Sequence, residues 1–297
     1  MIFYFVLAIL AAFCWSISSL ISADITRSIG GIAFNRLRLF FVSIVLIIYA
    51  TFINSWDTIN NEYLFKIILS GIIGIFLGDT LLFVALQKIG PRRNNILFSL
   101  AAPFTVILNI FFLKESMTLL SIFGCFTVFF GVVIAIAYGS DNDNDHRWEV
   151  IEGSLKIGVV LAILAALCQS IGLIMMKPIL DLGADPIASA AIRTTISFLI
   201  ISCTFLINSK YFTSPIPINF SIILKSFLSG FLGMALGMSL LLIALKNADA
   251  GIVATLSSTS PIMILFLIWL ITNKMPTKGA WFGTLIAIIG TGLIFLY

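Results

Sequence analysis

Long apolar stretches, separated by short polar links, follow one another along the whole chain. Each holds about 20 residues, the length at which an α-helix crosses the hydrocarbon core of a bilayer. The stretches lack the strict alternation of apolar and polar residues that membrane β-strands show. The pattern therefore predicts an all-α integral membrane protein with ten transmembrane helices. These span residues 2–22, 33–54, 65–87, 94–113, 119–138, 156–177, 187–207, 222–245, 251–271 and 279–296.

One link is longer and more polar than the others. Residues 139–153 read GSDNDNDHRWEVIEG, which is acidic and lies in the middle of the chain. Polar clusters of this kind separate structural units. We expect a first five-helix unit over residues 1–139, a polar acidic linker over 140–153 and a second five-helix unit over 154–297.

The two units repeat each other in sequence. SGIIGIFLGDTLLFVAL begins at Ser70, and SGFLGMALGMSLLLIAL begins at Ser229. A unit with five spans leaves the bilayer on the side opposite to its entry, so its copy enters upside down. Inverted repeats are the ground plan of many secondary transporters, with the solute site between the halves.

Glycines recur three and four residues apart in both copies of this segment. This spacing places them on one stripe of a helix, where small residues let neighbouring helices approach closely. The sequence predicts helix packing at Gly71, Gly74, Gly78, Gly230, Gly233 and Gly237.

Composition excludes several other classes of protein. The chain is 60% hydrophobic and only 10% charged, whereas soluble domains carry about 25% charged residues. Its net charge of +4 is spread over short links, so no nucleic-acid partner is predicted. The four cysteines fall inside the expected spans without metal-ligand spacing, and there is no nucleotide-binding Walker motif. We therefore predict no metal and no cofactor.

Asp79 is the ionisable residue placed deepest in an expected span. Charged groups at membrane depth are costly and usually mark solute or ion pathways. Its counterpart in the second copy is Met238, which is consistent with a group needed once in a shared cavity. Asp79 is a candidate for recognising a substrate amine or for carrying a coupling proton. The structural alternative is a hydrogen bond between helices to a serine, threonine or arginine, and an Asp79–Arg38 pair would be one way to neutralise both charges.

Three arginines lie in the expected second and seventh spans. Arg36 and Arg38 are about 200° apart around a helix, so they cannot both face one cavity. The repeat aligns Arg38 with Arg193. We expect Arg38 and Arg193 to face inward, where their planar guanidinium groups suit a carboxylate or phosphate, and Arg36 to extend toward the interface.

Further polar residues inside the spans are candidates for the lining of a cavity. Polar groups in mid-span need partners or water, although serine and threonine often bond to their own helix. A serine-rich run also precedes Pro261, which removes a backbone donor and favours an irregular helix. The candidates are Trp15, Gln169, Ser99, Asn109, Ser257 and Ser258.

Taken together, these motifs resemble the EamA family of the drug/metabolite transporter superfamily. The family's fourth-span motif appears as Pro103 followed by LKESMT over residues 113–118, and it is degraded after Pro261, where Asn273 replaces the glutamate. The resemblance covers essentially the whole chain. It implies a ten-helix carrier with a central cavity, in several relatives an exporter, and cytoplasmic termini. The excess of Lys and Arg in the odd-numbered links predicts instead that the termini lie outside.

These observations predict a multi-pass secondary-active transporter of the cell (inner) membrane that works by alternating access. Its expected partners are the lipid bilayer and a small-molecule substrate, most simply an amino acid or related metabolite to be exported. Protons are the candidate coupling ion, and the protein is expected as a monomer or homodimer. A multidrug exporter of the same fold is the nearest alternative, ahead of an intramembrane enzyme or a channel.

Overall fold

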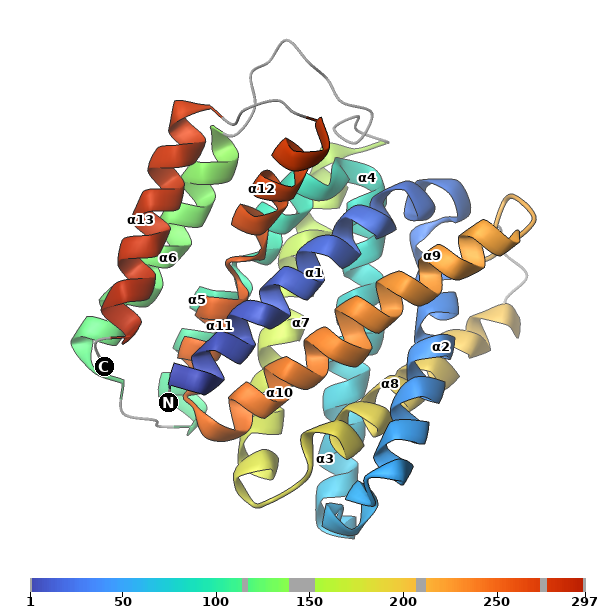
Figure 1. Ribbon diagram of the computed structural model, residues 1–297. Coiled ribbons are helices and arrows are strands. Elements are labelled where there is room, and N and C mark those ends of the chain that lie inside the picture. Colours follow the sequence, from blue (N-terminus) through green and yellow to red (C-terminus); the bar gives the residue numbers. More distant parts are fainter. Residues whose placement is uncertain (1, 114–116, 139–152, 207–211, 273–276, 296–297) are drawn as a thin grey trace.

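A computed structural model describes residues 2–113, 117–138, 153–206, 212–272 and 277–295. Over these ranges the protein is built from helices without strands (Figure 1). The first part of the chain contains α1 (Ile2–Ile29), α2 (Gly31–Phe52), η1 (Ser55–Thr58), α3 (Asn61–Gly71), η2 (Ile72–Leu77), α4 (Gly78–Phe98), α5 (Ala101–Leu108), η3 (Asn109–Leu113) and α6 (Leu119–Ala137). The second part contains α7 (Leu155–Asp181), α8 (Pro186–Cys203), η4 (Thr204–Leu206), α9 (Phe220–Gly230), η5 (Phe231–Leu236), α10 (Gly237–Asn247), α11 (Ala250–Ser257), α12 (Ser260–Thr272) and α13 (Lys278–Phe295).

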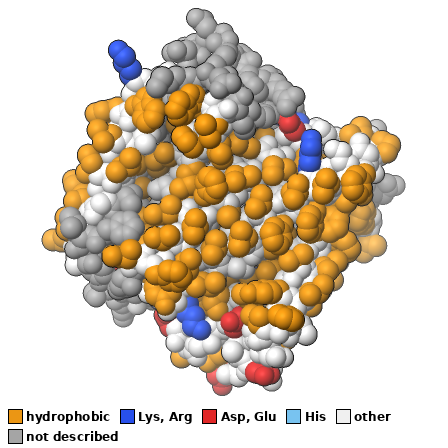
Figure 2. Space-filling model, in the orientation of Figure 1, with side chains coloured by type: hydrophobic (Ala, Val, Ile, Leu, Met, Phe, Trp, Pro, Cys, Tyr) orange, Lys and Arg blue, Asp and Glu red, His pale blue; other side chains and the backbone are white. Residues whose placement is uncertain are grey.

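The helices are long and apolar enough for a membrane. Within the described residues, eight helical segments meet the length and hydropathy expected of a span, and Leu119–Ile134 and Lys278–Gly290 are shorter apolar helices. Hydrophobic side chains cover most of the face seen in Figure 2, and charged side chains lie toward its margins. An apolar surface of this kind is suited to lipid, and the chain is a multi-pass membrane protein.

Two of the long helices contain a wide turn that the glycine pattern does not reveal. The π-helical turn η2 joins α3 to α4, and η5 joins α9 to α10 at the corresponding place in the second part. Gly74 and Gly233 lie within these turns. The sequence predicts one smooth stripe of glycines on a regular helix, but each stripe is interrupted by a π turn, a feature found frequently at functional sites.

Two other helices are broken near prolines. Helix α4 is kinked at Gly90, whose backbone is left-handed (φ 76°), and its second half begins at Pro91. This second half ends at Phe98, and α5 begins at Ala101. Likewise α11 ends at Ser257 and α12 begins at Ser260. Pro103 and Pro261 fall in the first turn of α5 and α12, where a missing backbone N–H is tolerated. The irregular backbone expected before Pro261 is therefore present.

The glycines lie where helices from the two parts of the chain meet. A Cβ atom on Gly71 would lie 2.9 Å from the backbone of Arg193 in α8, and one on Gly74 would lie 3.2 Å from Gly172 in α7. In the second part, a Cβ atom on Gly230 would lie 3.2 Å from the Arg38 carbonyl oxygen in α2. The region of the first π turn therefore packs against helices of the second part of the chain, and the region of the second π turn packs against a helix of the first part.

Helices α6 and α13 form a separate pair, which stands beside the rest of the bundle in Figure 1. They also touch through glycines. A Cβ atom on Gly131 would lie 2.4 Å from the Ala287 nitrogen, and one on Gly290 would lie 2.6 Å from the Val128 nitrogen. The remaining helices surround the site described next.

Candidate functional site

A cavity of about 90 Å³ lies inside the bundle, between helices from both parts of the chain. A water molecule needs roughly 10–15 Å³ by this measure, so the cavity has room for several waters or a small solute. Its lining consists of Trp15, Ser18, Ser19, Arg38, Asp79, Leu82, Phe83, Leu86, Asn94, Asn95, Phe98, Ser99, Ala101, Gln169, Leu173, Gly233, Met234, Met238, Ala254, Ser257, Ser258, Ser260 and Pro261.

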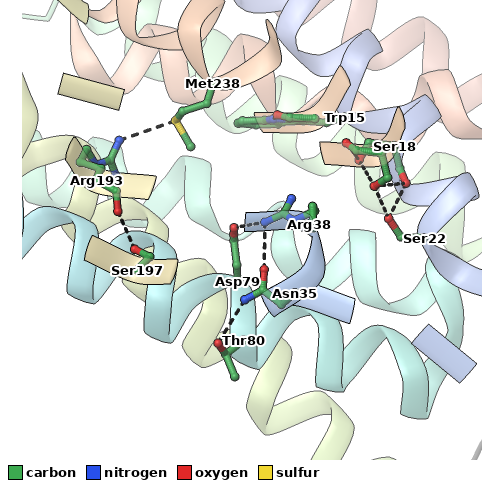
Figure 3. A network of polar contacts seen from close by, with 12 residues as sticks. Trp15, Ser18, Ser22, Asn35, Arg38, Asp79, Thr80, Arg193, Ser197 and Met238 are labelled. Carbon is green, nitrogen blue, oxygen red and sulfur yellow. Dashed lines mark hydrogen bonds and ion pairs between the residues drawn. The ribbon is translucent and has the colours of Figure 1, made fainter. Parts of the chain in front are cut away.

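An ion pair between α2 and α4 forms the charged part of the lining. Arg38 Nη2 donates to Asp79 Oδ2 and also to Asn35 Oδ1, at 3.2 Å from the latter. Asp79 is the second residue of α4, so the end of the π turn η2 sets its position. Only 4% of Arg38 and 8% of Asp79 are exposed. The sequence identifies both residues, and the structure brings them together (Figure 3).

Neighbouring groups hold this ion pair in place. Asn35 Nδ2 donates to Thr80 Oγ1 at 3.2 Å, which ties α2 to α4 beside the pair. The guanidinium carbon of Arg38 lies 4.5 Å from the centre of the Phe83 ring, close enough for a cation–π interaction. Arg38 is therefore oriented from two sides, and it presents Asp79 to the cavity in a fixed position.

Arg193 in α8 differs from Arg38 in its partners. It is fully buried, and it lies behind the cavity wall rather than in it. Its Nη1 approaches the Met238 Sδ atom at 3.7 Å, while Nε and Nη2 have no hydrogen-bond acceptor among the described residues. The sequence predicts that Arg193 itself lines the cavity, but the structure places it against Met238 (Figure 3). Met238 is the residue of this pair that lines the cavity.

Arg36 is not among the residues that line the cavity, and it contacts other parts of the chain. Only 7% of it is exposed. Its guanidinium donates to Thr204 Oγ1 at 3.2 Å and to the Phe212 carbonyl at 2.8 Å, and it lies over the Phe205 ring. These contacts with η4 and with the chain beyond it supply acceptors for the charge.

Trp15 lines the cavity and connects α1 to the second π turn. Its Nε1 donates to the Gly233 carbonyl at 2.7 Å, and a Cβ atom on Gly237 would lie 3.0 Å from its ring. One turn further along α1, Ser18 Oγ lies 2.9 Å from Ser229 Oγ. A backbone carbonyl inside a π turn is thus satisfied by a side chain from the other part of the chain.

The remaining predicted polar residues divide into two groups. Gln169, Ser99, Ser257 and Ser258 line the cavity. Ser99 and Ser257 donate to carbonyls of their own helices, as the 2.6 Å bond from Ser99 Oγ to the Ile96 carbonyl illustrates, which is the alternative expected for short hydroxyl side chains. Asn109 lies outside the cavity. It is fully buried at the start of η3, and neither of its amide atoms has a partner among the described residues.

Sequence reasoning missed an asparagine pair at the start of the expected fourth span. Asn95 Nδ2 donates to Ser19 Oγ at 3.1 Å and to the Pro91 carbonyl at 2.7 Å. Asn94 is 2% exposed, and its Oδ1 has no partner in the described part of the chain. Both residues line the cavity. Two neighbouring amides three and four residues after Pro91 are the signal that could have identified them.

A second group of charged residues lies at the C-terminal end of α7. Lys177 Nζ donates to Asp181 Oδ1 at 2.8 Å. Burial raises the pKa of Asp249, which precedes α11, although the charge of Lys177 opposes this effect. Glu115 of the LKESMT motif and Asn273, its counterpart after Pro261, lie outside the described residues. Among those described, no three His, Cys, Asp or Glu side chains gather in a way that could hold a metal ion.

Fold and site together define a membrane-embedded helical bundle with a small cavity, whose largely apolar lining includes a buried ion pair and several polar side chains, as expected of a solute transporter. The chain belongs to the EamA-like transporter family, because the family model matches residues 2–137 and again residues 156–296.

Two bacterial relatives are also transporters by name. The uncharacterized transporter sll1164 of Synechocystis sp. is 25% identical over 238 residues, or 78% of this chain and 65% of that protein. The uncharacterized transporter YyaM of Bacillus subtilis is 38% identical over 73 residues, or 25% of this chain and 24% of that protein. The chain therefore matches less than two thirds of the length of either relative.

The fold also has a match among solved structures. One crystal structure aligns with 99% of this chain and 96% of its own, with a TM-score of 0.78 and 15% sequence identity. At this identity the likeness concerns the fold alone.

Proposed function

We propose that this family member is a secondary-active transporter that moves a small metabolite by alternating access, and that it exports an amino acid or a related compound. The buried Arg38–Asp79 pair on the wall of the internal cavity carries the proposal. Charged groups at membrane depth mark solute pathways. A cavity with polar serines and amides beside an ion pair suits a small solute with charged groups of its own.

The architecture in this proposal is a pair of inverted five-helix repeats with ten spans, over residues 1–139 and 154–297. Three observations support it. The π turns η2 and η5 occupy corresponding places in the two copies. The contact of Gly71 with Arg193 has its counterpart in the contact of Gly230 with Arg38. The family model matches twice, once in each repeat. Rocking of one repeat against the other would open the cavity to each side in turn.

The same proposal places the protein in the cell membrane and assigns Asp79 as the carrier of a coupling proton. Contact with an arginine favours the charged form of a carboxylate, and burial without that contact favours the protonated form. Separation of the Arg38–Asp79 pair during transport would thus couple proton uptake to the movement of the solute.

A multidrug exporter of the same fold is the second candidate. The aromatic side chains of Trp15, Phe83 and Phe98 on the cavity wall favour it. A cationic drug would require a free carboxylate, however, and Asp79 is already paired with Arg38. The ion pair therefore favours a small metabolite over a bulky cation.

Counterflow in liposomes tests the proposed function. Purified protein is reconstituted into vesicles loaded with one unlabelled L-amino acid at a time, and uptake of the same labelled amino acid is followed. Transient accumulation above that of protein-free vesicles is expected for at least one amino acid. If none accumulates while a cationic dye does, the multidrug alternative replaces the metabolite proposal.

A further inference from the structure

The guanidinium of Arg193 has hydrogen-bonding capacity that the described residues do not use. It carries five N–H donors, yet the hydrogen bond that its side chain makes within the described residues goes to the Met238 sulfur at 3.7 Å. Thioether sulfur is a weak acceptor. The Nε and Nη2 atoms have no acceptor at all in the same part of the chain, although the side chain is fully buried. A buried polar group in this condition is costly unless a partner arrives from elsewhere.

Charge balance around Asp79 leads in the same direction. Asp79 forms a hydrogen-bonded pair with Arg38, while its charge also acts on Arg193 from a greater distance. Among the described residues, Asp79 is the one acidic member of the cavity lining. Two guanidinium groups thus face one carboxylate, and this group of three residues keeps a net positive charge. Arginine remains protonated in proteins, so a bound anion is the natural means of compensation.

Met238 connects Arg193 to the cavity. It is one of the residues that line the cavity, and its sulfur atom contacts Arg193 (Figure 3). It is the second residue of α10, directly after the π turn η5, at the position that Asp79 occupies after η2. Methionine is unbranched and flexible, and it adapts easily to changes in its surroundings. A rotation of this side chain would expose the guanidinium to a solute in the cavity.

We propose that Arg193 is the binding subsite for a carboxylate of the transported solute, and that Met238 covers this subsite until the solute displaces the thioether. The planar fork of arginine matches a carboxylate in a bidentate arrangement. Met238 therefore stands where the first repeat has its own carboxylate, and the solute supplies the missing one. This inference rests on the proposed function, because the solute has to enter the cavity first.

The decisive variant is Met238→Asp, which leaves Arg193 in place. The new carboxylate would pair with Arg193 as Asp79 pairs with Arg38, and it would occupy the subsite permanently. Met238→Asn is the matched control, since asparagine has the same shape without the charge. The thermal unfolding midpoint of each purified protein is measured in detergent with propionate, L-alanine or ethylamine, against sodium chloride at equal ionic strength. The three compounds differ only in their carboxylate and amine groups.

A carboxylate bound at this subsite should raise the unfolding midpoint of the wild-type protein and of Met238→Asn by about 2 °C or more, because a ligand that binds the folded state stabilises it. Ethylamine should have no effect. Met238→Asp should unfold at a higher temperature without any ligand, and propionate and L-alanine should not raise it further. A shift with both compounds supports a general carboxylate subsite, and a shift with L-alanine alone supports an amino-acid subsite.

The inference is overturned if neither carboxylate shifts the wild-type protein, or if Met238→Asp responds as strongly as the wild type. It is also overturned if ethylamine acts as strongly as L-alanine. Counterflow separates this failure from that of the proposed function. If some solute is transported but no carboxylate shifts the unfolding midpoint, the proposed subsite is wrong and the proposed transport function still holds. If no solute gives counterflow, the proposed transport function itself is wrong.

Discussion

Asp79 owes its importance to the residues that surround it. It is buried against Arg38, which is itself held by Asn35 and Phe83. Removal of one member of a buried ion pair leaves the other charge uncompensated, at a cost of about 3–5 kcal/mol. Removal of both members leaves no such charge. The stability of the folded protein therefore distinguishes a true pair from two independent residues.

A double-mutant cycle on this pair gives the first prediction. Arg38→Gln and Asp79→Asn should each lower the unfolding temperature in detergent, and the double variant should lose less than the sum of the two single losses. The reason is that the double variant buries two neutral amides able to bond to each other. Strictly additive losses, measured by thermal unfolding, would show that the two side chains do not depend on each other.

The arginines supply a second prediction at this scale. Arg38→Ala and Arg193→Ala should each reduce solute flux more than Arg36→Ala, when flux is expressed per folded protein. Arg38 lines the cavity and Arg193 lies directly behind Met238, whereas Arg36 contacts the end of α8 and Phe212. Flux through proteoliposomes measures the effect. The opposite ranking would contradict the assignment of Arg38 and Arg193 to the solute pathway.

At the scale of elements, the π turns join the scaffold to the site. Each turn contains a glycine of the packing stripe and ends shortly before the residue that reaches the cavity, which is Asp79 in one copy and Met238 in the other. The glycine spacing in the sequence predicts close helix contact. It does not predict the π turn, because the hydropathy of a segment is the same whether its backbone forms α-helical or π-helical hydrogen bonds.

Close contact at Gly71 gives a prediction with a built-in control. A Cβ atom there would lie 2.9 Å from the Arg193 backbone, while one on Gly292 would meet nothing within 4 Å. Gly71→Ala should therefore destabilise the protein by about 1–3 kcal/mol through overpacking, and Gly292→Ala should leave the unfolding temperature almost unchanged. The unfolding temperatures of both variants, measured in the same detergent, test this prediction. Equal unfolding temperatures would show that the contact between α3 and α8 can accommodate an extra methyl group.

For the whole molecule, the sequence contained most of the organisation and part of the site. Span lengths follow from hydropathy, and comparison of the two repeats points to Arg38, Arg193 and Asp79. Charge balance suggests an Arg38–Asp79 pair, but the sequence does not show whether the two side chains meet, because this depends on how α2 crosses α4. The Met238 contact of Arg193 and the place of Asn94 in the cavity wall were missed for the same reason. Contacts between helices far apart in sequence leave no periodic signal.

The number of spans in each repeat gives a prediction on this scale. Five spans place the linker on the side of the membrane opposite to both termini. A cysteine introduced as His146→Cys into a variant without its four native cysteines should react with an impermeant thiol reagent from one side only. A cysteine placed after Tyr297 should react from the other side. Labelling of both from the same side would contradict the five-helix unit.

The central claim is that the cavity beside Asp79 is the route of the solute. Uptake of the amino acid that gives the largest counterflow signal, driven by an imposed pH gradient and compared between wild-type and Asp79→Asn proteoliposomes with equal amounts of folded protein, tests it most directly. We predict that Asp79→Asn reduces the initial rate at least about tenfold, which corresponds to an increase of about 1.4 kcal/mol in the activation free energy. A wild-type rate in the Asp79→Asn protein would contradict the account.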